Sequence, residues 1–213
     1  MNIFARWVGS AALVLALTGH AHAAETLPPM NAADNAIFAR MPQLLADGAV
    51  HILGNPQGDV TIIEFFDYQC PYTRNVAPRV SAAVRADGNV KLVLKSFPVI
   101  GPGSRIGARA AYAAKLQGKN FAAFHEALLA YKGVFTKEAM QKLAGDAGLN
   151  PVRLSDDMDT LDAADAVTVN FDQARSIKVT STPSFIIDGH LMTEPSAEID
   201  FPKAIAAARA KNK

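Results

Sequence analysis

A nearly uninterrupted apolar segment, VTIIEFF at residues 60–66, places the tightest constraint on the fold of this chain. It is rich in β-branched and aromatic residues, which is typical of a central strand buried on both faces, as in a parallel sheet. Residues 89–97, NVKLVLKSF, predict a second strand. The segment between them has Val76, Val80 and Val84 at helical spacing. The sequence therefore predicts a strand–helix–strand unit.

The remaining segments predict helices around and after this unit. A short helix from about Asn35, broken near Pro42, precedes a brief strand at about residue 50. Residues 98–178 carry several helical patterns, with Asn120 and Thr136 as expected caps. Residues 182–194 predict two strands joined by an Asp-Gly turn, and residues 199–211 predict a last helix.

The N-terminal 23 residues have the pattern of a secretory signal peptide. Arg6 precedes an apolar run, and the segment ends in the small-residue pattern Ala-His-Ala, so we expect cleavage before Ala24. An uncleaved membrane anchor is the alternative, but the run is shorter than the roughly 20 apolar residues that a bilayer requires. We therefore expect a periplasmic or secreted protein with an N-terminal segment at residues 24–49 and a domain at residues 50–213.

The charges exclude several classes of function. The chain has 21 Lys and Arg against 20 Asp and Glu, and removal of Arg6 with the signal would balance them. No basic cluster suggests binding to nucleic acid, or to a membrane after signal cleavage. His51, His125 and His190 are scattered, so the sequence predicts no metal site.

Cys70, in the stretch EFFDYQCPYTRN, is the only cysteine. An exported chain enters an oxidising compartment, yet this one cannot form an internal disulfide. A single cysteine in such a protein indicates a reactive thiol or pairing with another chain. The alternative is a buried, inert cysteine that packs as a small apolar side chain.

The order of elements, with Cys-Pro-Tyr after the first central strand, resembles the DsbA-like thiol–disulfide oxidoreductases of thioredoxin fold. The resemblance covers about residues 50–210 and includes GDVTIIEFFDYQCPY and the later TSTPSFIIDG. It implies an α/β, thioredoxin-like fold with a helical insertion, at about residues 98–178, between the strand–helix–strand unit and a cis-proline strand–strand–helix unit.

The resemblance assigns roles to the residues around the cysteine. Cys70 matches the attacking cysteine, at a helix N-terminus that favours the thiolate, and we expect its sulfur to be accessible. Pro71 fits the first helical turn. Tyr72 occupies the position that tunes the thiolate, or it is simply a partly exposed aromatic residue.

Two further positions match the family. Thr182 and Pro183 correspond to the cis-proline loop beside the active-site sulfur, which would pair with an extended substrate; an ordinary trans proline is the alternative. Glu64 corresponds to a buried acid that accepts a proton, although a solvent-facing carboxylate at a sheet edge is the other interpretation.

Thr73 departs from the family pattern, which has a second cysteine at this position. Threonine cannot form a disulfide, but its hydroxyl could donate a hydrogen bond to the Cys70 thiolate. The substitution argues against dithiol oxidase activity. It is either natural or engineered, and the intact signal sequence favours a natural precursor.

Two functions remain open at this point. The first is a monothiol enzyme, isomerase-like or reductase-like, that acts on disulfide-containing or unfolded exported proteins through mixed disulfides. It would need no cofactor apart from an external small thiol such as glutathione. The second is a non-catalytic peptide-binding or chaperone-like protein. A homodimer is possible in either case. A cysteine hydrolase is a distant third, because no motif places a histidine beside Cys70.

Overall fold

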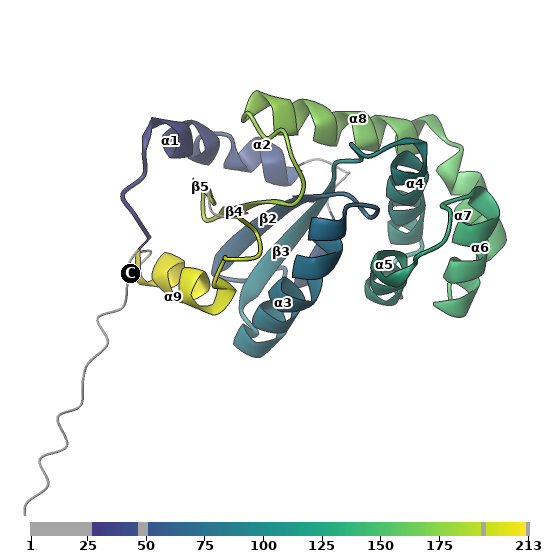
Figure 1. Ribbon diagram of the computed structural model, residues 1–213, viewed down its shortest axis with the longest axis horizontal. Helices are drawn as coiled ribbons and strands as arrows, with labels where there is room; N and C mark the ends of the chain where they lie inside the picture. Colours follow the sequence, from purple (N-terminus) through teal and green to yellow (C-terminus); the bar gives the residue numbers. More distant parts are fainter. Residues whose placement is uncertain (1–26, 47–50, 193–194, 212–213) are drawn as a thin grey trace, which may run out of the picture.

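The computed structural model describes residues 27–46, 51–192 and 195–211. The proposed signal peptide and its cleavage site lie outside these residues. The described strands form one five-stranded sheet in the order β1-β3-β2-β4-β5 (Figure 1). Their bounds are β1 His51–Gly54, β2 Val60–Phe66, β3 Val90–Ser96, β4 Ser184–Ile187 and β5 His190–Leu191.

The centre of the sheet has the pairing that the sequence predicts. Strands β2 and β3 are parallel, with Val60 opposite Val90 and Phe66 opposite Ser96. The helix α3 (Pro71–Asp87) connects them. Strand β4 pairs antiparallel with the other side of β2, and β1 pairs antiparallel with β3. Strand β2 therefore has hydrogen-bonded neighbours on both sides and lies inside the sheet. Its continuous apolar sequence reflects the burial of both of its faces.

Helices cover both faces of the sheet. On one face, Ile62 and Phe66 pack in a large core with α3 and the C-terminal helix, and on the other, Ile63 and Phe65 pack in a smaller core. In Figure 1, α3 and α9 lie below the sheet, and α1, α2 and α8 lie above it. The helices outside the strand–helix–strand unit are α1 Ala32–Phe38, α2 Met41–Ala46, α4 Pro102–Leu116, α5 Phe121–Ala130, α6 Lys137–Asp146, α7 Pro151–Met158, α8 Leu161–Ser176 and α9 Phe201–Lys211.

The helices α4 to α8 form the predicted insertion between β3 and β4. Thr136 caps α6 as expected, since its hydroxyl accepts a hydrogen bond from the Ala139 amide at 3.2 Å. The expected capping by Asn120 is wrong. Its φ is 64°, and its side-chain amide instead donates to the Gly148 carbonyl oxygen at 3.1 Å. The Asn120 side chain therefore links the turn before α5 to the turn after α6, and it does not cap the N-terminus of α5.

The short N-terminal helix is broken as the sequence predicts. It divides into α1 and α2 around residues 39–40, and Pro42 lies in the first turn of α2, where proline is tolerated. Helix α1 packs against the edge strand β5. The buried Asp34 carboxylate accepts a hydrogen bond from the Leu191 amide and lies 3.4 Å from His190 Nδ1. The segment thus covers one exposed edge of the sheet.

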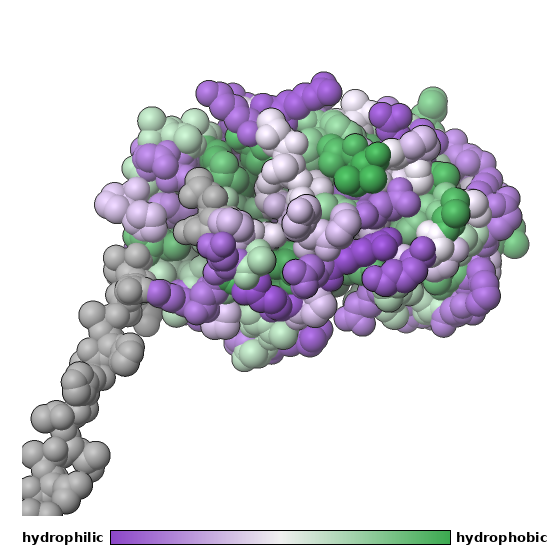
Figure 2. Space-filling view, viewed as in Figure 1, coloured by the Kyte–Doolittle hydropathy of each residue, from purple (hydrophilic) through white to green (hydrophobic). Residues whose placement is uncertain are grey.

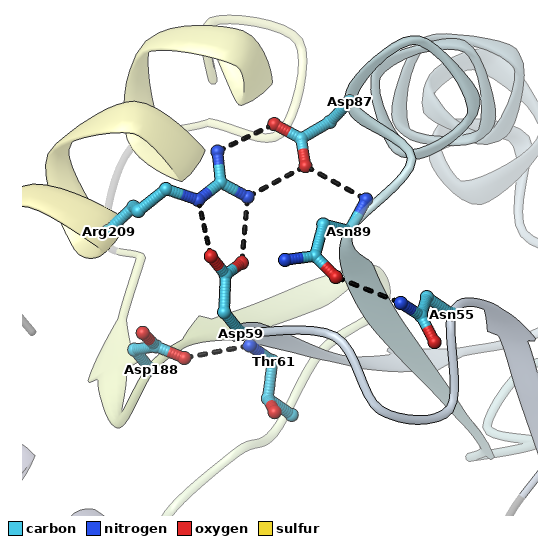
Figure 3. Close-up of polar contacts among 7 residues, drawn as sticks. All are labelled: Asn55, Asp59, Thr61, Asp87, Asn89, Asp188 and Arg209. Carbon is cyan, nitrogen blue, oxygen red and sulfur yellow. Dashed lines mark hydrogen bonds and ion pairs between the residues drawn. The ribbon is translucent and has the colours of Figure 1, made fainter.

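An arginine joins three elements at the end of the sheet where β2 begins. Arg209 of α9 makes bidentate hydrogen bonds to Asp59, which precedes β2, and to Asp87, the last residue of α3 (Figure 3). The four N–O distances lie between 2.7 and 2.8 Å. Bidentate guanidinium–carboxylate pairs combine charge with fixed geometry. This cluster therefore holds the two ends of the strand–helix unit against the C-terminal helix.

None of the helices within the described residues combines the length and apolar character needed to cross a membrane.

Candidate active site

Cys70 occupies the N-cap position of α3, immediately before Pro71. The chain leaves β2 at Phe66, turns through residues 67–69 and enters the helix at this point. A helix N-terminus presents backbone N–H groups without intrahelical partners and a partial positive charge, which favour an anionic sulfur. The expected accessibility is wrong for this conformation, because Cys70 is only 3% exposed.

The sulfur contacts the loop that precedes β4. Cys70 Sγ lies 3.3 Å from the carbonyl oxygen of Thr182, to which the thiol donates a hydrogen bond. The Thr182–Pro183 peptide bond is cis. The position follows from the sheet, since β4 begins at Ser184 and pairs directly with β2. Two segments that are 112 residues apart in sequence thus meet at the sulfur.

Asp67 fixes the turn that carries the cysteine. Its buried carboxylate accepts hydrogen bonds from the amides of Gln69, Val99 and Ile100 at 2.8, 2.9 and 2.9 Å. Its backbone carbonyl also accepts from the Cys70 amide at 3.0 Å. One carboxylate therefore connects the cysteine turn to the loop between β3 and α4. Sequence reasoning missed this residue; its place directly after a strand and three residues before the cysteine was the available signal.

Thr73 does not make the predicted hydrogen bond to Cys70. Its side chain is fully buried in the first turn of α3, and Oγ1 has no hydrogen-bond partner among the described residues. The hydroxyl therefore does not replace the S–H donor of a second cysteine in this conformation. Instead it is a buried polar group that carries a desolvation cost.

Glu64 is buried in the middle of β2, with an exposed fraction of 3%. It lies opposite Leu94 and Phe185 in the neighbouring strands, so it faces the large core rather than solvent at a sheet edge. Burial raises the pKa of Glu64 to about 8. No hydrogen bond joins it to Cys70 among the described residues. A carboxyl with a pKa near 8 is mostly protonated at pH 7, so it can release a proton and then take one up again.

A second buried polar pair lies close to the cysteine turn. The hydroxyl of Tyr68 is 2.8 Å from Nδ1 of His125 on α5, and both side chains are buried. Burial lowers the pKa of His125 to about 4, so the imidazole is neutral at pH 7. Burial, together with the charge of Glu64, raises the pKa of Tyr68. The pair joins the helical insertion to the cysteine turn, and nothing in the sequence pattern related two residues so far apart.

Apolar side chains surround the cysteine turn at the surface. Tyr72 is 70% exposed, and Val99 and Ile100, whose amides bind Asp67, are 42% and 57% exposed. Figure 2 shows an apolar patch between α8 and the start of α3, where the loop from β3 to α4 runs. The exposure of Tyr72 agrees with a partly exposed aromatic residue, and the suggested tuning role stays a prediction.

Residues 46–207 match the family model described as thioredoxin, which covers most of the chain and both segments of the site. The chain belongs to the thioredoxin family. A thioredoxin-like oxidoreductase from Silicibacter pomeroyi DSS-3 is a similar solved structure. It has 35% sequence identity and a TM-score of 0.68, and the match covers 86% of this chain and 99% of that one.

Curated relatives place this thioredoxin-family protein among DsbA-like members. The probable disulfide bond formation protein D of Bacillus cereus is 27% identical over 164 residues, which are 70% of this chain and 74% of that protein. The Na(+)/H(+) antiporter NhaA 1 of Salinispora arenicola is 28% identical over 141 residues. Those residues are 65% of this chain but only 22% of the antiporter, so the chain spans about a fifth of that protein's length.

The fold and the family resemblance are thus confirmed. One relative is named a probable disulfide bond formation protein, and Cys70 lies where the fold brings a sulfur against the loop of Pro183. The roles assigned above to individual residues remain predictions.

Proposed function

We propose that this protein is an exported thiol–disulfide exchange enzyme that works through a single nucleophilic cysteine, with isomerase-like or reductase-like activity. The observation that carries the proposal is the position of Cys70. It lies at the N-cap of α3 with Sγ 3.3 Å from the Thr182 carbonyl oxygen, in a chain of the thioredoxin family.

The chemistry requires one thiolate and an external thiol. The Cys70 thiolate attacks one sulfur of a substrate disulfide, forms a mixed disulfide and releases the other sulfur as a thiolate. Thr73 provides no second sulfur to displace the substrate. Release therefore depends on another thiol of the substrate, which completes an isomerisation, or on an external small thiol, which leads to reduction. Neither route donates a disulfide to the substrate.

The surface around the cysteine supports polypeptide substrates. Tyr72, Val99 and Ile100 are exposed apolar side chains at or beside the cysteine turn. Such side chains favour contact with the apolar residues that unfolded or misfolded proteins expose. The Thr182 carbonyl, freed from the thiol, could accept a hydrogen bond from an extended substrate. Export would supply such substrates, with the signal at residues 1–23 cleaved before Ala24.

A refolding comparison tests the proposal. The protein is added to a substrate protein with scrambled disulfides, in the presence of a small thiol, and separately to the reduced substrate protein without an oxidant. We expect recovery of native substrate in the first assay, little net oxidation in the second, and loss of the first activity in Cys70→Ser. Equal recovery with wild type and Cys70→Ser would contradict a catalytic cysteine.

The 3% exposure of Cys70 favours a second candidate, a peptide-binding protein that does not turn over. In that case unfolded chains bind at the apolar surface around Tyr72 without a covalent step. Cys70→Ser would retain full binding and full protection of an unfolded protein from aggregation. Tyr72→Ala would weaken both. If Cys70→Ser loses the exchange activity but retains peptide binding, the protein is an enzyme rather than a binding protein.

A further inference from the structure

A groove between α4 and α8 gathers three arginines. It has a volume of about 400 Å³, and the charged residues that line it are Arg105 and Arg109 of α4 and Arg175 and Asp172 of α8. Arg105 and Arg109 are one helical turn apart, so they lie on the same side of α4. Like charges at this spacing repel each other and destabilise a helix. The arrangement therefore has an electrostatic cost unless an anion binds there.

Among the described residues, none of the three guanidinium groups forms an ion pair with a carboxylate. Asp172 likewise forms no ion pair with a cationic side chain there. Arg175 stacks on the ring of Phe171, with its central carbon 5.8 Å from the ring centroid. The groove between α3 and α5 differs in this respect. There, Arg85 pairs with Glu126, and Arg74 donates to the Tyr68 carbonyl oxygen. The three arginines of the groove between α4 and α8 are thus available to a ligand, whereas Arg74 and Arg85 of the other groove are engaged.

The helix that carries Arg105 and Arg109 contacts the cysteine turn. The Ser104 hydroxyl donates a hydrogen bond to Gln69 Oε1 at 3.1 Å, and Gln69 precedes Cys70 in the chain. Arg105 follows Ser104 directly. Adjacent Cα atoms are only about 3.8 Å apart, and an extended tripeptide spans roughly 10 Å. The inference requires that a tripeptide-sized ligand held by Arg105 reach from the α8 side of α4 to the sulfur of Cys70.

We propose that the groove binds a small peptide thiol that has two carboxylates and one α-ammonium group. The three arginines would bind the two carboxylates, and Asp172 would bind the ammonium group. Guanidinium groups pair well with carboxylates. The volume of about 400 Å³ falls within the range of small-ligand sites. An acidic segment of a protein is the alternative occupant, and the binding measurement below distinguishes the two.

The inference rests on the proposed function and names the external thiol that it requires. The thiol loses its proton, and its thiolate attacks Cys70 Sγ in the mixed disulfide with the substrate. The Cys70–substrate S–S bond breaks, and the substrate leaves as a thiolate that takes up a proton. Cys70 is then joined to the small thiol. A second small thiol attacks this bond, regenerates the Cys70 thiolate and leaves as the oxidised dimer of the small thiol. Two small thiols thus reduce one substrate disulfide.

A kinetic comparison tests the groove with two thiols of different charge. Cys70 is first converted to its mixed disulfide with 4-thiopyridine, and release of 4-thiopyridone is followed after addition of glutathione or of uncharged 2-mercaptoethanol. We expect the ratio of the glutathione rate to the 2-mercaptoethanol rate to fall about fivefold in the double variant Arg105→Gln, Arg109→Gln. Glutamine preserves helix propensity. Lys119→Gln removes one exposed charge beyond the end of α4 and should leave the ratio unchanged. An unchanged ratio in the double variant would overturn the inference.

A binding measurement separates this inference from the exchange activity itself. S-methylglutathione, which cannot react, is titrated by calorimetry into Cys70→Ser with the groove intact, and into the same protein with both arginines replaced. We expect binding that weakens about fivefold with the replacements and also with added salt. If S-methylglutathione binds both proteins equally or neither, the groove is not a site for such thiols. Binding of an acidic peptide without binding of S-methylglutathione would also overturn the inference. None of these outcomes depends on turnover by Cys70.

Discussion

The sulfur of Cys70 and the carbonyl oxygen of Thr182 lie 3.3 Å apart, although the two residues are 112 positions apart in the sequence. The contact closes the resting site, because the thiol has a hydrogen-bond acceptor and is almost fully buried. A substrate disulfide must therefore displace the Thr182 loop or approach along the small remaining opening. Burial of a nucleophile in this manner discriminates between reagents by their size.

Alkylation of Cys70 should show this size selection. We expect the ratio of the iodoacetamide rate to the rate of a bulky polymer-linked maleimide to be about tenfold higher in the native protein than in concentrated guanidinium chloride. Because both reagents attack the thiolate, the ratio of their rates does not depend on the fraction of Cys70 that is ionised. Equal ratios in the two states would mean that the sulfur is open in solution.

Glu64→Gln should make the stability of the protein less dependent on pH. Burial raises the folded-state pKa of Glu64 to about 8 from an ordinary value of 4.5. Between these pH values the folded protein keeps a proton that the unfolded chain has released, so stability falls as pH rises. The gain in free energy of unfolding from Glu64→Gln should be larger at pH 8 than at pH 5 by on the order of 3 kcal/mol.

Urea unfolding of both proteins at the two pH values measures this difference. The buried histidines His51 and His125 also change stability across the range, but they are present in both proteins and cancel in the comparison. A gain that is the same at pH 5 and pH 8 would show that Glu64 ionises as it does in water.

The strand–helix–strand unit at the centre of the fold could be predicted from the sequence because its signals are local. Each local signal lies within a few residues: the continuous apolar pattern of β2, the helical spacing of Val76, Val80 and Val84, and the glycine that follows α3. Gly88 ends α3 with a φ of 74°, a conformation that favours glycine. The family resemblance then placed the cis-proline loop beside the sulfur, whereas the pairing of β4 with β2 came only from the structure.

The contacts that shape the site could not be predicted in the same way. The Asp67 carboxylate binds amides 32 and 33 residues later, and the Tyr68 hydroxyl meets His125 57 residues later. Each depends on where the loop from β3 and the helical insertion pack against the cysteine turn. The burial of Thr73 Oγ1 also depends on tertiary packing. From the sequence alone, a threonine in the first helical turn is often expected to be solvated or to cap the helix.

Arg209→Gln should destabilise the protein more than loss of an isolated surface ion pair. Hydrogen bonds from Arg209 lower the pKa of both Asp59 and Asp87 below the ordinary value of 3.8. Their contribution to stability is present above that value and is lost as pH falls through the lowered pKa. We expect a decrease in Tm of about 3 °C at pH 6 and a smaller one at pH 3.

Thermal unfolding by circular dichroism measures both effects. Lys142→Gln is the matched control, because Lys142 makes a single exposed ion pair with Asp146 on α6 and its loss should change Tm by less than about 1 °C. Equal effects of the two variants at pH 6 would indicate that the three-element cluster adds nothing beyond an ordinary surface pair.

Thr73→Val should stabilise the protein and leave thiol exchange intact. Valine has nearly the shape of threonine and removes a buried hydroxyl that lacks a hydrogen-bond partner among the described residues. The free energy of unfolding should rise by about 1 kcal/mol. Exchange rates with 2-mercaptoethanol should stay within about twofold of wild type. A large loss of exchange would mean that the hydroxyl does bind the Cys70 thiolate during the reaction.

Thr73→Cys should convert the protein into a dithiol oxidase. Position 73 lies in the first turn of α3, three residues after Cys70 at the N-cap, so the helix brings the two side chains to one side. The site at position 73 is already buried, and a thiol is smaller than the side chain of threonine, so the fold should tolerate the change. We expect an internal disulfide, detected as a loss of two mass units, and oxidation of a reduced substrate protein that wild type does not perform. Thr73→Ser is the control, since it keeps a hydroxyl and adds no sulfur. If Thr73→Cys forms the disulfide but oxidises nothing, the obstacle lies in substrate access to the buried Cys70 rather than in the missing sulfur.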